Sequence, residues 1–188
     1  DVLVGDDGDN RLFGHAGDDT LTGGAGDDRL VGGSGTDTVD YSQSAASVEV
    51  NLAQGAASGE DVGSDVLRNV ENVIGGAGDD IITGSSGDNV LRAGDGDDTL
   101  YGGGGTDELY GGAGDDLCGA SAGTMTINTG GGDDSLKLLG SLTSVSSVDV
   151  NNDGNLDLQF EANFMTDYTV TINNQANAAL SSVELDLD

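Results

Sequence analysis

The sequence is poor in the residues that build a conventional globular core. Trp is absent, and aromatic residues make up only 4% of the 188 residues, so we expect no thick hydrophobic core. Pro is absent as well, which suits a chain made of turns and hydrogen-bonded strands, because Pro removes a donor from a strand ladder. A single cysteine, Cys118, leaves no internal disulfide to form.

Positive charge and long apolar runs are equally scarce. The chain has 5 basic residues against 35 acidic ones, a formal net charge of −30. Nucleic acid and anionic membrane surfaces are therefore poor partners, and cations are the obvious ones. No apolar run approaches the roughly 18 residues of a membrane-spanning helix. No signal peptide is visible in a chain that starts at Asp1.

Familiar catalytic motifs are missing too. The sequence contains no G-x-S-x-G elbow, no H-E-x-x-H zinc helix and no Walker loop. Its one histidine, His15, cannot complete a Ser-His-Asp or zinc triad, and we interpret it as a solvated loop residue. Two carboxylates could serve as acid and base, but the repeat described next already accounts for the carboxylates. We therefore expect no catalysis in this chain.

What the sequence does contain is a repeat of nine residues. Residues 75–137 divide into seven consecutive nonapeptides with no slip of the frame. Glycine occupies the fourth place in each unit, Asp or Asn the sixth in all but one, and an aliphatic residue or Cys118 the eighth. Four similar units span residues 5–40, and residues 1–4 fit places six to nine, which indicates an array cut from a larger protein. A short fixed period is the signature of a repeat architecture.

Each place in the unit has a physical interpretation. Glycines at the first, second and fourth places permit backbone torsions that a Cβ would forbid, so the chain can turn tightly and aim its carbonyls at one point. Places seven to nine form a short strand, and because side chains alternate along a strand, the eighth residue points inward. The predicted inward column is Leu12, Leu21, Leu30, Val39, Val73, Ile82, Leu91, Leu100, Leu109, Cys118, Ile127 and Leu136.

The unit resembles G-G-x-G-x-D-x-U-x, the calcium-binding nonapeptide of the RTX (repeats-in-toxin, hemolysin-type) family. The resemblance implies an all-β fold: a parallel β-roll, a right-handed β-helix-like solenoid with a C-terminal β-strand cap. Two nonapeptides then make one coil, and equivalent turns stack every 18 residues. It also implies several Ca²⁺ ions between stacked turns, a donor set of oxygens that suits this hard cation. The alternative, a flexible Gly/Asp-rich linker, is disfavoured by seven units in register.

The resemblance assigns the calcium ligands to the sixth places and to glycine carbonyls. We expect strong sites where carboxylates stack without interruption and weaker ones where Asn89 and Met125 interrupt them. The sixth-place ligands of the first block are Asp1, Asp19 and Asp37 on one edge and Asn10 and Asp28 on the other. Those of the second block are Asp80, Asp98, Asp116 and Asp134 on one edge and Asn89 and Asp107 on the other. The backbone ligands are the carbonyls of Gly24, Gly26, Gly76, Gly78, Gly112 and Gly114.

The chain divides into residues 1–40 (first repeat block), 41–74 (irregular connecting coils), 75–137 (second block) and 138–188 (cap). In the second segment, residues 48–52 alternate like a half-buried strand, residues 53–65 read as a loop, and residues 66–75 return to the roll. The segment is similar to connectors between repeat blocks of large RTX and epimerase-like proteins. We interpret it as irregular coils with a surface excursion; the alternative is a flexible hinge between two rolls.

The last segment changes character. Glycine thins out and apolar alternation predicts longer strands, as expected of a cap, which an open repeat array needs at its end. Within it, the run from Asp149 to Asp157 resembles the D-x-[DN]-x-[DN]-G calcium loop. The oxygen side chains are Asp149, Asn151, Asp153, Asn155 and Asp157. Place 12 is Phe160 instead of Glu, which leaves an Asx-rich hairpin turn as the alternative.

The function implied by the resemblance is that of a calcium-binding roll in a bacterial protein exported by the type I route. Such a roll is unfolded in low calcium and folds outside the cell, where it aids export and supports a neighbouring domain. The alternative is an extracellular module that binds carbohydrate or a cell surface. Tyr101 and Tyr110 are outward residues nine places apart, so they fall on opposite faces, which weakens a carbohydrate platform.

Overall fold

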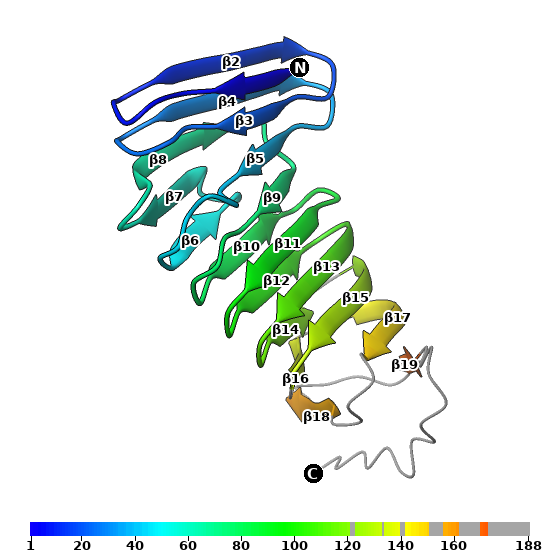
Figure 1. Cartoon of the computed structure of the whole chain (residues 1–188). Helices are drawn as coiled ribbons and strands as arrows, with labels where there is room; N and C mark the ends of the chain where they lie inside the picture. Colours follow the sequence, from blue (N-terminus) through cyan, green and yellow to red (C-terminus); the bar gives the residue numbers. More distant parts are fainter. Residues whose placement is uncertain (121–122, 133, 140–141, 151–155, 162–169, 173–188) are drawn as a thin grey trace.

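The nonapeptides stack into two sheets that face each other across a narrow core (Figure 1). The structure, a computed structural model, describes residues 1–120, 123–132, 134–139, 142–150, 156–161 and 170–172. In these residues every regular element is a strand, which confirms the predicted all-β roll. None of the described residues forms a helix long and apolar enough to cross a membrane.

Successive nonapeptides alternate between the two sheets. Sheet A contains, in spatial order, β1 (Val2–Val4), β3 (Thr20–Thr22), β5 (Thr38–Asp40), β9 (Asn72–Ile74), β11 (Val90–Asp95), β13 (Thr106–Ala113), β15 (Gly123–Gly131), β17 (Leu142–Val150) and β19 (Val170–Ile172). Sheet B contains β2 (Arg11–Ala16), β4 (Arg29–Ser34), β8 (Gly63–Arg68), β7 (Ala56–Gly59), β6 (Val48–Asn51), β10 (Ile81–Ser85), β12 (Thr99–Gly103), β14 (Leu117–Ala120), β16 (Asp134–Leu139) and β18 (Leu156–Glu161).

Register within each block follows the predicted spacing of 18 residues. Leu91 lies beside Leu109 in sheet A, and Ile82 lies beside Leu100 in sheet B. The side chains of the eighth places fill the space between the sheets, as predicted. Fully buried members of this column are Leu21, Leu30, Val39, Val73, Ile82, Leu91, Leu100, Leu109, Cys118 and Ile127. Leu12 is partly buried at the first coil, and the side chain of Leu136 lies outside the described part.

Residues 41–71 interrupt this spacing without interrupting the sheets. Sheet A passes directly from β5 to β9, with Thr38 beside Asn72. Sheet B instead inserts an antiparallel meander of β6, β7 and β8, whose outer strands pair in parallel with β10 and β4. The predicted strand at 48–52 is confirmed as β6.

The predicted loop at 53–65 is wrong, since it contains β7 and the first half of β8. The residues of β7 are Ala-Ala-Ser-Gly, which have little strand propensity of their own. They form a strand because partners on both sides supply hydrogen bonds.

Two smaller features depart from expectation or lie beyond it. His15 was predicted in a loop, but it belongs to β2, where it is exposed and stacks on Phe13 with ring centroids 6.4 Å apart. It occupies a second place and keeps the positive φ, 75°, that glycine has there in other units. At the other end, β17, β18 and β19 extend both sheets, and the cap itself stays a prediction.

Candidate metal-binding turns

The sixth place of each unit lies just before a strand and turns its side chain under the preceding turn. These side chains are almost fully buried: Asp98, Asp107 and Asp116 are 1%, 0% and 2% exposed. They stack into two columns, one at the edge of each sheet. Column A contains Asp1, Asp19, Asp37, Glu71, Asn89, Asp107 and Met125. Column B contains Asn10, Asp28, Asp65, Asp80, Asp98, Asp116 and Asp134.

One carboxylate oxygen of each sixth-place residue links neighbouring coils. Oδ1 of Asp98 accepts the backbone N–H of Asp80 at 2.7 Å, and Oδ1 of Asp116 accepts that of Asp98 at 2.9 Å. Asp134 continues the chain by accepting from Asp116 at 2.8 Å. In column A, Asp107 accepts from Asn89 at 3.0 Å. Each carboxylate therefore bonds to the backbone one coil earlier and fixes the stacking of the turns.

The second oxygen, Oδ2, is directed back at the first-place glycine of its own unit. Built Cβ atoms on Gly75, Gly102 and Gly111 would meet the carboxylate five residues later. These first-place glycines do not have positive φ, in contrast to most glycines at the second and fourth places. The sequence interpretation of the first place was therefore wrong: this glycine supplies space for a buried carboxylate and not an unusual torsion.

Most of these Oδ2 atoms are buried without a hydrogen-bond partner. Asp80 is an exception, because its Oδ2 accepts the N–H of Gly76 at 2.8 Å. The buried carboxylates whose Oδ2 has no partner in the structure are Asp19, Asp28, Asp37, Asp98, Asp107 and Asp116. A buried carboxylate oxygen without a donor is costly, and a cation is the ligand that would satisfy it.

The electrostatics of the columns also favour a bound cation. Loss of hydration raises the pKa of Asp98 and Asp116 to about 7, and neighbouring carboxylates such as Asp80 and Asp134 add to the rise. The same burial raises the pKa of Asp65 and Asp107 to about 6. These groups resist ionisation in the absence of a compensating positive charge.

Backbone carbonyls supply further oxygens at the turns. A Cβ on Gly94 would clash with the carbonyl oxygen of Gly76, and one on Gly96 would come within 2.7 Å of that of Gly78. The same relation holds one coil later, where Gly130 and Gly132 cover the carbonyls of Gly112 and Gly114, and earlier, where Gly63 covers that of Gly26. Five of the six predicted carbonyl ligands thus face the next turn, while Gly24 lines a cavity described below.

A second carboxylate ladder, which the sequence interpretation missed, runs along the fifth places. Oδ1 of Asp97 accepts the N–H of Asp115 at 2.8 Å, and Oδ1 of Asp79 accepts that of Asp97 at 3.0 Å. These bonds run to the following coil, whereas those of the sixth places run to the preceding one. The repeated Asp-Asp pair is the sequence signal for this arrangement. Both members therefore hold adjacent turns together, one in each direction.

Two column members were also missed in the connecting segment. Asp65 accepts the N–H of Asp28 at 2.9 Å and the hydroxyl of Tyr41 at 2.8 Å. Glu71 accepts the N–H of Asp37 at 2.9 Å. Each precedes an inward apolar residue, Leu67 or Val73, by two positions, which is the spacing of sixth and eighth places. That spacing was the available signal.

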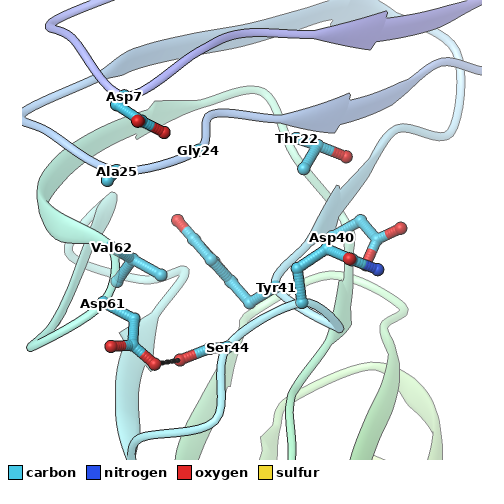
Figure 2. Close-up of a pocket in the computed structure, with 10 residues that line it drawn as sticks. Asp7, Thr22, Gly24, Ala25, Asp40, Tyr41, Ser44, Asp61 and Val62 are labelled. Carbon is cyan, nitrogen blue, oxygen red and sulfur yellow. Dashed lines mark hydrogen bonds between the residues drawn. The ribbon is translucent and has the colours of Figure 1, made fainter.

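The connecting segment is fastened to the first block around a small cavity (Figure 2). Asp7 and Asp61 line it together with the ring of Tyr41. Oδ2 of Asp61 accepts the N–H groups of Ala45 and Ala46, both at 2.9 Å, and these bonds lower the pKa of Asp61. This contact holds the turn after β5 against the meander.

The donor set fits calcium, which prefers six to eight oxygen ligands from carboxylates and carbonyls. The described residues contain no group of three or more His, Cys, Asp or Glu side chains placed to hold a metal ion. Asn151, Asp153 and Asn155 of the predicted C-terminal loop lie outside the described residues, as do the side chains of Asp149 and Asp157. That loop stays a prediction.

Comparison with known proteins agrees with the two repeat blocks. Residues 4–39, 70–100 and 83–118 match the model of the RTX calcium-binding nonapeptide repeat, in four copies. No curated protein matches the chain. The matched ranges leave out residues 40–69, the part that forms the antiparallel meander in sheet B.

Proposed function

Since the chain carries RTX calcium-binding nonapeptide repeats in a β-roll, we propose that it is a calcium-dependent folding module of a secreted bacterial protein. The observation that supports this most directly is the stack of buried carboxylates with unpartnered Oδ2 atoms. The sixth-place residues of columns A and B and the carbonyls facing the next turn are the groups that would hold the ions. Bound calcium supplies the positive charge that these oxygens lack.

The same carboxylates oppose folding when no cation is present. Their raised pKa values show that burial disfavours the ionised form. A ligand that binds only the folded state stabilises it by about 2.7 kcal/mol per site at a hundredfold excess over its Kd. Extracellular calcium modules bind at about 10⁻⁴–10⁻³ M. Several such sites make folding depend on the millimolar calcium found outside cells.

This dependence suggests how the module serves its parent protein. A chain that stays unfolded in a low-calcium cytoplasm is suited to export in an extended form, and folding outside then supports a neighbouring domain. RTX repeats are calcium-binding structural elements, and we assign no reaction to this chain. Any catalytic activity of a parent protein would belong to another domain.

A calcium titration followed by far-UV circular dichroism tests the proposal, with magnesium as the control ion. We expect a cooperative gain of β-structure near millimolar calcium and none with magnesium. Asp98→Asn should raise the calcium midpoint several-fold, whereas Asp95→Asn, at an exposed position on the next turn, should leave it unchanged. A full native spectrum in chelator would contradict a folding role for calcium.

The alternative, a carbohydrate- or surface-binding module, has less support. Tyr101 lies on β12 of sheet B and Tyr110 on β13 of sheet A, so the two rings form no common platform. The guanidinium of Arg92 also covers the ring of Tyr110 at 3.9 Å. A glycan array probed at millimolar calcium tests this function, and binding to a defined glycan would support it.

A further inference from the structure

Three of the five basic residues of the chain gather on one surface. Arg11, Arg29 and Arg68 lie on β2, β4 and β8, three adjacent strands of sheet B at the N-terminal end of the roll (Figure 1). Register places Arg11 beside Arg29, and Arg68 beside Val31. All three are exposed, because the inward positions of these strands belong to leucines. We call this surface, with Phe13, Val31 and Val66, the arginine face.

The arginine face carries no negative charge of its own. The remaining outward positions of the three strands are held by Ser64 and His15 besides the apolar residues. Glu49 is the first carboxylate on this side of sheet B, on β6, with β7 between it and β8. Asp9 and Asp27 lie at the adjoining turn, where Asp9 accepts the N–H of Asp27. The face is therefore a positive area bordered by acidic turns.

The three guanidinium groups are also free of partners. The described residues contain one ion pair, between the terminal amine of Asp1 and Asp19, and no hydrogen bond from these arginines. Arg92, on sheet A, differs because it stacks on Tyr110. Each free guanidinium presents five donors in a planar fork that matches a carboxylate.

Exposed apolar side chains lie between the arginines. Phe13 is 45% exposed and Val66 41% exposed. Arginine together with aromatic residues is the composition enriched at protein–protein interfaces. The cavity beside Tyr41 is lined by other residues, so ligands would meet the arginine face as an open sheet surface.

We propose that the arginine face docks a short acidic segment of a partner protein. Carboxylates of the segment pair with Arg11, Arg29 and Arg68, and its apolar side chains cover Phe13 and Val66. Neighbouring strands are about 4.8 Å apart, so a segment lying across β2 and β4 meets successive guanidinium groups. An extended polyanion or an anionic membrane would instead meet the rest of a chain of net charge −30 and be repelled. A short segment confines its contacts to the positive area.

The test is fluorescence anisotropy of a short labelled peptide of Glu interspersed with Leu, added to the full chain in millimolar calcium. We expect saturable binding that weakens with salt and is weakened about tenfold by Arg29→Glu, roughly the loss of one charged pair and gain of one repulsion. Arg92→Glu changes the net charge equally but on sheet A, so it should leave the affinity unchanged. Phe13→Ser should also weaken binding.

Further measurements distinguish this docking from a loss of folding, from a general effect of net charge and from binding of a different ligand class. Circular dichroism and the calcium midpoint should be the same for Arg29→Glu and the wild type, because the residue is exposed. Equal weakening by Arg29→Glu and Arg92→Glu would overturn the proposal, since net charge alone would then account for binding. Arg29-dependent binding of heparin oligosaccharides or phosphatidylserine vesicles, with none of the peptide, would overturn it in favour of those ligands.

Discussion

Columns A and B perform the same structural task with different chemistry. From Asp80 to Asp134, column B is an unbroken stack of carboxylates. Column A has Asn89 in the equivalent position, and its Oδ1 accepts the N–H of Ser85 at 2.6 Å much as Asp80 accepts that of Gly76. Met125 is fully buried in the same column and offers no oxygen. Fastening the turn therefore requires only an acceptor, whereas a calcium site requires charge.

The largest effect should come from filling the space beneath a column B carboxylate. In Gly111→Ala the new methyl group would collide with Asp116 and with the backbone carbonyl of Thr129. We expect a loss of about 3 kcal/mol or more in the free energy of unfolding, measured by urea denaturation in calcium. Gly102→Ala in column A should cost less, because one of its obstacles is the flexible end of Met125. Gly104→Ala, which meets only ordinary contacts, is the control.

Neutralising one carboxylate in each column compares their calcium sites directly. Asp98 lies between Asp80 and Asp116, whereas Asp107 lies between Asn89 and Met125. We expect Asp98→Asn to lower the stability in saturating calcium by about 2 kcal/mol, the contribution of roughly one site, and Asp107→Asn to lower it less. In chelator Asp98→Asn should be neutral or stabilising. Equal losses in calcium would show that the columns do not differ.

Protonation should partly replace calcium in column B. The unfolded pKa of Asp98 and Asp116 is near 3.8 and the folded value is about 7, so the folded state holds more protons in between. Stability in chelator is therefore greatest near pH 4 and falls as the pH rises to 7. Urea denaturation in chelator across this range measures the fall, and Asp98→Asn should flatten it. A chelated chain that gains stability from pH 4 to 7 would contradict the burial argument.

The smallest effect should come from repairing column A. Met125→Asp restores a carboxylate next to Asp107. We expect about 1 kcal/mol of added stability in saturating calcium, because the gain of a site is offset by lost apolar burial. The same variant should be less stable than the wild type in chelator. Met125→Leu, which keeps the apolar volume, should show neither change in calcium dependence.

The periodicity of the sequence was sufficient for most of the fold and the columns. Leu91 and Leu109 are predicted to be stacked inward residues by their spacing alone, and both are fully buried. Asp98 and Asp116 are predicted column neighbours for the same reason. These predictions succeed because each repeat contacts mainly the repeats one coil away.

The features that the sequence did not reveal depend on contacts between distant residues. Asp65 and Glu71 join the columns through bonds to Asp28 and Asp37, 37 and 34 residues away. The strand β7 forms only because β6 and β8 flank it.

The sequence by itself therefore determined the coil length, the inward column and the positions of the carboxylates, because a strict nine-residue period repeats the same local geometry. Only the tertiary structure decided how the two blocks join, why the first-place glycine is required, and that three arginines share one face. Each of these depends on which atoms neighbouring coils bring together in space, and no local pattern of residues encodes that arrangement.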